Sequence, residues 1–106
     1  MPIEEKWTNR LTHEDRVEVR LVKDKAVIID FSVQYVAQIH GKWYPIIRFD
    51  TAHGKPHLDI SKPDGSFEKR NFLHPYFDYR DAFNKAITEV NQRWTELRQS
   101  FEKEVG

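Results

Sequence analysis

The sequence predicts an α+β fold in which an antiparallel meander of four or five strands packs on one long C-terminal helix. Two patterns in its 106 residues support this prediction. Over residues 16–73, apolar and polar residues tend to alternate, as in strands that bury one face. Over residues 78–104, apolar residues recur at steps of three and four, as on one side of a helix. A chain of this length is expected to form a single domain, residues 1–106.

Residues 1–15 are mostly polar. Ile3, Trp7 and Leu11 are the apolar anchors, and their spacing of four suits a short helical turn. We therefore predict an N-terminal arm that is partly ordered by Trp7.

The clearest strand pattern lies between residues 27 and 39. Every odd-numbered residue there is apolar, so we expect the odd face to be buried under the helix. A turn at residues 23–25 precedes this strand. Pro45 in the following strand donates no hydrogen bond to a sheet and suits a strand's start, an edge or a bulge; a bulge near Trp43 and Tyr44 would accommodate it. Another strand is predicted from residue 16 to the turn at 23–25. Three more are predicted over residues 43–50, 56–61 and 67–73.

The helix is predicted from about Tyr79 to Lys103. Asp78 can accept hydrogen bonds from first-turn amides, and Asp81 follows in the capping-box position. The predicted core stripe consists of Phe83, Ile87, Val90, Trp94, Leu97 and Phe101. Three ion pairs are expected on the outer surface: Asp81–Lys85, Glu89–Arg93 and Arg98–Glu102.

Composition excludes several kinds of site. The 17 basic residues equal the 17 acidic residues in number, whereas proteins that coat nucleic acid usually carry a basic excess. Without cysteine the chain forms no disulfide, thiolate zinc site or cysteine nucleophile, as in a reducing compartment. No signal peptide or membrane-length apolar run is evident. We expect a cytoplasmic protein with no membrane contact.

The segment from residue 48 to residue 59 gathers two histidines, two aspartates, one lysine and one arginine around a predicted hairpin turn. A three-residue loop at 40–42 would place Gln34 opposite Arg48. A four-residue loop at 51–54 would place Arg48 opposite His57. The result is a row, Gln34–Arg48–His57, on the face away from the helix.

The same pairing places Asp50 opposite Lys55, with Asp59 beside the row. His53 is at the loop tip, where Gly54 can take a positive φ. The predicted binding residues are Gln34, Asp50, Gly54, Lys55 and Asp59.

Three interpretations of this cluster stay open. In the first, His57 and His53 transfer protons while Arg48 holds phosphate, as metal-independent RNA cleavage requires. In the second, the two histidines bind a divalent metal with Asp50 or Asp59. In the third, Asp50 accepts amide hydrogen bonds in an Asx-type turn and Arg48 pairs with Asp59. We expect no cofactor, with a divalent metal on His53, His57 and Asp50 as the alternative.

The segment from Arg48 to His57 resembles the signature of a small group of uncharacterised prokaryotic proteins. These carry an aromatic-Asp-x-Ala-His-Gly-x-x-His core on a compact α+β domain, and distant relatives are toxin-like members of toxin–antitoxin pairs. The resemblance implies that Asp50, His53, Gly54 and His57 are the motif positions. At residues 58–59 this sequence has Leu-Asp, where the toxin-like relatives continue with a basic or histidine residue.

Two functions follow from these patterns. The chain is expected to be a non-enzymatic protein-interaction domain. The alternative is a toxin-like, metal-independent ribonuclease with His57 as general base, His53 as general acid and Arg48 as phosphate clamp. The expected partners are a second copy in a homodimer, an antitoxin-like protein, or RNA. The homodimer contact is expected at four apolar residues on the face away from the helix: Ile28, Val36, Tyr44 and Ile46.

Overall fold

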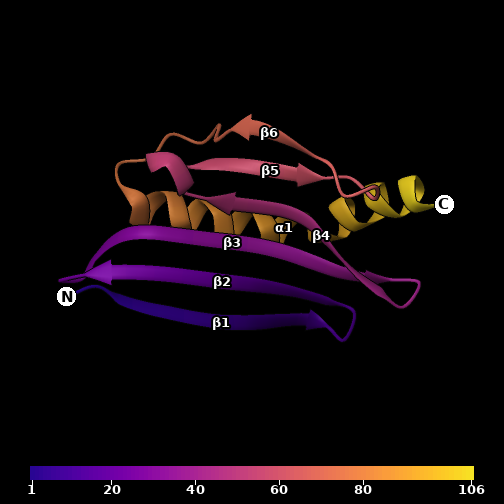
Figure 1. Ribbon diagram of the computed structural model, residues 1–106, viewed down its shortest axis with the longest axis horizontal. Coiled ribbons are helices and arrows are strands. Elements are labelled where there is room, and N and C mark those ends of the chain that lie inside the picture. The colour runs from indigo at the N-terminus through magenta and orange to yellow at the C-terminus, as the bar shows by residue number, and fades with distance from the viewer.

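The computed structural model describes the backbone of residues 1–106 and every side chain except that of His53. Within this part of the chain, consecutive strands pair antiparallel and form one six-stranded meander (Figure 1). The α+β prediction is confirmed, with more strands than expected. The strands are β1 (Ile3–Thr12), β2 (Asp15–Asp24), β3 (Val27–Ile39), β4 (Lys42–Asp50), β5 (His57–Ser61) and β6 (Phe67–Asn71). The helical segments are the 3-10 turn η1 (Ala52–Gly54) and the helix α1 (Tyr79–Val105).

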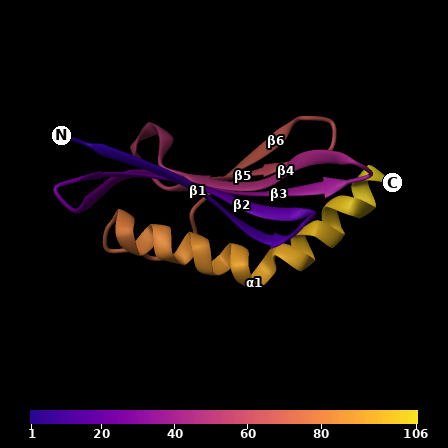
Figure 2. The same ribbon diagram turned by 90° about the horizontal axis from the view of Figure 1, so that it is seen from below.

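Helix α1 covers one face of the sheet, and nothing in the described chain covers the other (Figure 2). The predicted apolar stripe faces the strands: Val90 and Phe101 are buried, and the other four members pack partly buried against the core. Ala82 and Ala86 are also fully buried, which small side chains permit where a helix lies close to a sheet. The contact is mainly with β3.

Both ends of α1 are capped. Asp78 accepts a hydrogen bond from the Asp81 amide at 2.9 Å, and the Asp81 carboxylate accepts one from the Phe77 amide at 3.0 Å. Gly106 has φ 91° and donates its amide to the Glu102 carbonyl at 3.2 Å. The three predicted ion pairs along the helix are all present. Within the described residues, no helix has both the length and the apolarity of a membrane span.

Residues 3–12 form an edge strand rather than the predicted arm. Trp7 pairs with Val19 of β2, and its ring meets Phe83 of α1 edge to face with centroids 6.4 Å apart. A spacing of four is a multiple of two, so the anchors Ile3, Trp7 and Leu11 suit a strand as well as a helical turn. Because β1 contains few apolar residues, its sequence does not show the alternation typical of a strand.

Two β-bulges shift the alternation at the ends of β3. Ile29 is the extra residue opposite β2, and Ile46 of β4 is the extra residue opposite β3, directly after Pro45. Ile28 and Ile46 consequently belong to the core under the helix. Val27 and Ile29 were predicted to be buried and are instead exposed.

The bulges also remove the predicted apolar patch from the face away from the helix. Tyr44 lies under the helix, with its ring centroid 5.2 Å from that of Phe101. Of the four residues predicted for a homodimer contact, the register leaves only Val36 on that face, and Val36 is itself buried. The apolar basis of the homodimer prediction is therefore wrong.

The starts of β2, β4 and β5 each differ from the prediction by one residue, and the ends of β2 and β6 differ by two. β2 continues to Asp24, so the turn before β3 consists of Lys25 and Ala26, both with positive φ. β6 ends at Asn71 rather than at residue 73.

A buried ionic cluster attaches the C-terminal half of α1 to the sheet. Asp15, which is 4% exposed, accepts hydrogen bonds from Tyr35 at 2.5 Å, Thr12 at 2.7 Å and Arg98 at 2.8 Å. Arg98 also donates to the Gln38 carbonyl at 2.9 Å. Burial raises the pKa of Asp15, but the three hydrogen bonds and the charge of Arg98 outweigh burial, so this pKa lies below its usual value. Periodicity had placed Arg98 only on the outer surface.

The buried face is tested by comparing two phenylalanines. Phe31 is 1% exposed and Phe77 is 99% exposed. Phe31→Ala should lower the free energy of unfolding by about 3–5 kcal/mol, because it leaves a cavity in the core, while Phe77→Ala should change it by less than about 0.5 kcal/mol. Urea unfolding measures both. Similar small losses in the two variants would contradict the core described above.

The Asp15–Arg98 pair is tested by Arg98→Met, with Arg93→Met as the control from the same helix. Removing Arg98 leaves the buried Asp15 charge without its partner, so we expect a loss of about 3–5 kcal/mol. Arg93 pairs only at the surface and should contribute less than about 1 kcal/mol.

The same cluster predicts a pH dependence. The depressed pKa of Asp15 stabilises the fold above its ordinary value of 3.8, and this contribution is lost as the pH falls through the folded-state pKa. Asp15→Asn should flatten the stability profile below about pH 4. A profile of unchanged shape would contradict this assignment.

Candidate functional site

The β4–β5 connection is longer than predicted. Residues 51–56 join the strands, rather than 51–54. His57 therefore lies opposite Asp50, and Asp59 lies opposite Arg48. The predicted pairs Asp50–Lys55 and Arg48–His57 are wrong by two residues, although this shift keeps Arg48, Asp50 and His57 on the face away from α1. The pairing of Gln34 with Arg48 is confirmed, but the predicted loop 40–42 is wrong: the turn is residues 40–41, and the bulge at Ile46 supplies the additional residue. The row therefore runs Gln34–Arg48–Asp59.

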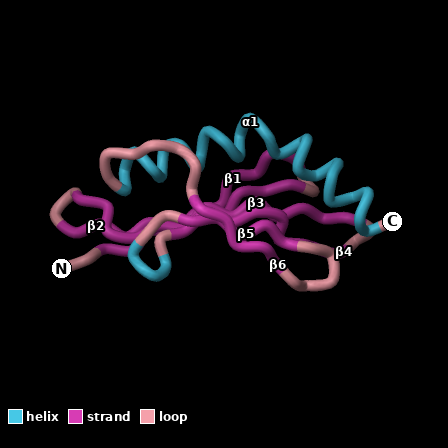
Figure 3. The backbone as a smooth tube through the Cα atoms, turned by 90° about the horizontal axis from the view of Figure 1, so that it is seen from above, coloured by secondary structure: helices cyan, strands magenta, loops and turns pink.

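The β4–β5 connection is longer than predicted because Thr51 forms hydrogen bonds with β3 instead of starting the turn. Its amide donates to the Phe31 carbonyl at 3.2 Å, and its hydroxyl accepts from the Phe31 amide at 3.0 Å. The hydroxyl also donates to the Asp30 carboxylate, which Arg20 holds from the other side at 2.8 Å. Burial raises the pKa of Asp30, but these two partners outweigh burial and keep the pKa below its usual value. The chain can reverse only after Thr51, through η1 (Figure 3).

Asp50 is at the centre of the site. Its side chain is 7% exposed, and both of its oxygens are engaged. Arg48 Nε lies 2.8 Å from Oδ2, while His57 Nε2 lies 2.9 Å from Oδ1. The Ala52 amide donates to Oδ1 at 3.2 Å, as expected for an Asx-type turn. Arg48 thus pairs with Asp50 and not, as the third interpretation expected, with Asp59.

The ring of His57 is held at both nitrogens. Nε2 faces Asp50, and Nδ1 lies 3.2 Å from the carbonyl oxygen of Lys55. Both contacts are hydrogen bonds only when both nitrogens carry protons. A general acid or base needs one ring nitrogen directed at the substrate. In this arrangement both ring nitrogens face acceptors within the protein, the Asp50 carboxylate and the Lys55 carbonyl.

Asp59 is the least satisfied member of the site. Arg48 and Lys69 are its neighbours on the adjacent strands, yet its Oδ1 is buried and receives no hydrogen bond from the described residues. Asp50, His57 and Asp59 each offer one ligand atom, and these three atoms lie within 4.8 Å of one another. Two carboxylates and an imidazole form a donor set that divalent transition metals accept.

The remaining predicted site residues are in the connecting loop. Gly54 has φ 85°, as expected, and its carbonyl accepts a hydrogen bond from Tyr79 at 2.5 Å. Lys55 is exposed and contributes its carbonyl to His57. The side chain of His53 lies outside the described part of the chain, so its predicted roles stay predictions.

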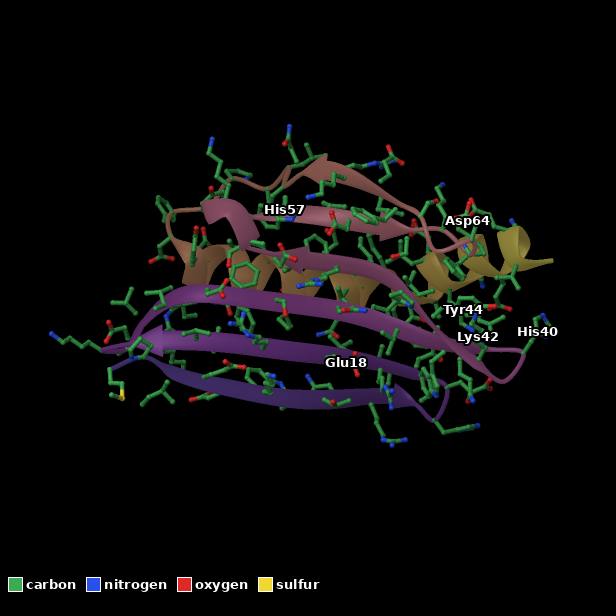
Figure 4. All side chains as sticks on the ribbon, viewed as in Figure 1. Glu18, His40, Lys42, Tyr44, His57 and Asp64 are labelled. Carbon is green, nitrogen blue, oxygen red and sulfur yellow. The ribbon has the colours of Figure 1, made fainter. Side chains whose placement is uncertain are left out.

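The face of the sheet away from α1, hereafter the open face, carries two parallel rows of polar side chains. The register aligns one residue from each strand in each row, and Figure 4 shows Glu18 of one row and His57 of the other on this face. The first row is Lys6, Arg20, Ser32, Asp50, His57 and Asn71. The second row is Thr8, Glu18, Gln34, Arg48, Asp59 and Lys69.

Two shallow hollows border these rows. One, of about 540 Å³, lies at the β6 edge and is lined by His57, Lys69, Arg70, Asn71 and Leu73. The other, of about 330 Å³, lies over β1, β2 and β3 among polar residues of both rows. In the described part of the open face, these two hollows are shallow and lined largely by charged and polar residues.

Sequence reasoning missed Thr51, Asp30 and Arg20. Alternation marks Asp30 and Arg20 as outward residues, which is correct. No local pattern shows that a loop threonine binds the backbone of a strand twenty residues earlier.

Comparison with known proteins gives a family and no activity. The family model described as a domain of unknown function (DUF7718) matches residues 1–106. No curated protein and no solved structure matches the chain.

The site predicts opposite effects for its two aspartates. Asp50→Asn removes the charge that holds Arg48 and His57, so it should lower the free energy of unfolding by about 1–3 kcal/mol. Asp59→Asn removes a buried carboxylate oxygen that has no donor, so the metal-free protein should be unchanged or slightly more stable. Urea unfolding in the presence of a chelator compares the two. Equal losses would contradict the unequal roles of the two residues.

Proposed function

Because the chain belongs to the DUF7718 family of domains of unknown function, we propose its function from the geometry of the open face. The protein is a non-enzymatic interaction domain that binds a second protein on this face.

The open face itself carries the proposal. Its two polar rows cross all six strands, and no described part of the chain covers them. Its charges have both signs. Arg20 pairs with Asp30, and Arg48 pairs with Asp50, so the side chains are already fixed in position. A fixed pattern of mixed charges favours a protein with the complementary pattern, because such patterns set register and reject wrong partners. The zero net charge disfavours nucleic acid.

The same face argues against an apolar self-contact. Its one large aliphatic member from the predicted homodimer patch, Val36, is buried by its neighbours. A polar partner such as an antitoxin-like protein suits the face better than a second copy. The lack of cysteine favours a cytoplasmic setting for this interaction.

A toxin-like, metal-independent ribonuclease is the second candidate. The chain of contacts Arg48–Asp50–His57 favours it, since an oriented imidazole beside an arginine suits phosphate chemistry. The position of His57 weighs against it, because both ring nitrogens face acceptors within the protein.

Crosslinking in the native host tests the interaction. Lys6 and Lys69 belong to the open face, whereas Lys85 and Lys103 lie on α1. A lysine-reactive crosslinker followed by mass spectrometry should join Lys6 and Lys69, and not the helix lysines, to one recurring protein. Lys69→Glu should weaken binding of that protein, once purified, by about tenfold, and the control Lys103→Glu should leave it unchanged.

Three results would contradict the proposal. Crosslinks confined to Lys85 and Lys103 would place the interaction on the helix. Crosslinks between two copies alone would support the homodimer. Cleavage of RNA by the purified protein without metal, lost in His57→Ala and retained in His40→Ala, would support the ribonuclease.

A further inference from the structure

We propose that Asp50, His57 and Asp59 form a binding site for a divalent transition metal ion on the open face. This inference goes beyond the interaction function and does not depend on it. The three residues lie on β4 and β5, so the ion would join the two strands beside their connecting loop.

The spacing of the ligand atoms is the first argument. Zinc binds nitrogen and oxygen ligands at about 2.0–2.2 Å with tetrahedral geometry, which places ligand atoms about 3.2–3.6 Å apart. His57 Nε2 and Asp50 Oδ1 lie 2.9 Å apart and face each other. All three candidate ligand atoms fall within 4.8 Å of one another. Small side-chain adjustments therefore suffice to place an ion between them.

The surrounding contacts are the second argument. A histidine that binds a metal through one ring nitrogen usually donates its other N–H to a carbonyl or carboxylate, which fixes the ring. Nδ1 of His57 has this contact with the Lys55 carbonyl at 3.2 Å. Arg48 holds Oδ2 of Asp50 at 2.8 Å, which leaves Oδ1 turned towards His57. These contacts orient the ligands before any ion binds.

The third argument comes from Asp59. Its buried Oδ1 receives no hydrogen bond from the described residues. A buried carboxylate oxygen without a donor is destabilising, and a cation compensates for this. The two carboxylates supply two negatively charged ligand groups, with Arg48 paired to the other oxygen of Asp50. The imidazole ligand favours zinc or a similar transition metal over magnesium or calcium, which prefer oxygen ligands alone.

Zinc titration of the chelator-treated protein tests the site. Isothermal titration calorimetry should show one saturable zinc site in the wild type. His57→Gln and Asp59→Asn should each weaken binding at least tenfold. The matched controls are His40→Gln and Asp64→Asn, two exposed turn residues far from the site (Figure 4), and both should bind zinc as the wild type does.

A second measurement separates loss of the site from loss of the fold. Zinc should raise the Tm of the wild type and leave that of Asp59→Asn unchanged, although metal-free Asp59→Asn is folded by circular dichroism. In ¹H–¹⁵N spectra, zinc should shift the amides of residues 50 and 57–59 and not those of residues 40 and 64. Non-saturable binding, or equal zinc affinity in wild type, His57→Gln and Asp59→Asn, would overturn the proposal. Loss of binding in His53→Gln with Asp59→Asn unaffected would overturn the ligand set.

Discussion

A single helix can cover only one side of a six-stranded sheet, and the rest of the structure depends on this constraint. Each strand must place apolar residues on the covered face and polar residues on the other, because adjacent side chains of a strand point in opposite directions. Phe31, Val33 and Tyr35 therefore meet α1, while Ser32 and Gln34 face outward. The two polar rows of the open face follow directly from this division.

Polar contacts then fix the helix on the sheet at both ends. Near its start, Tyr79 donates to the Gly54 carbonyl and Arg80 donates to the Ala26 carbonyl. In its C-terminal half, Arg98 reaches the buried Asp15 and the Gln38 carbonyl. Apolar packing alone would permit the helix to slide along the sheet. These directional contacts give it one position, which also keeps the β4–β5 loop in place beneath Tyr79.

The loop in turn determines the chemistry of the open face. Thr51 binds β3 and delays the chain reversal, so His57 lies beside Asp50 instead of Lys55. A lysine there would extend into solvent on a flexible side chain, whereas the imidazole is held by a carboxylate and a backbone carbonyl. This rigidity supports the roles in recognition and in ion binding that we propose for the cluster.

The sequence by itself determined the elements whose signal is local. The period of α1 and its Asp78 cap specify the helix, and the alternation within residues 27–39 specifies the long strand β3. Only the tertiary structure decided the bulge at Ile29, the position of His57 opposite Asp50, and the pair Asp15–Arg98, whose members are 83 residues apart. The physical reason is that these features depend on hydrogen bonds and packing between segments distant in the chain. The local periodicity of apolar residues gives no information about such contacts.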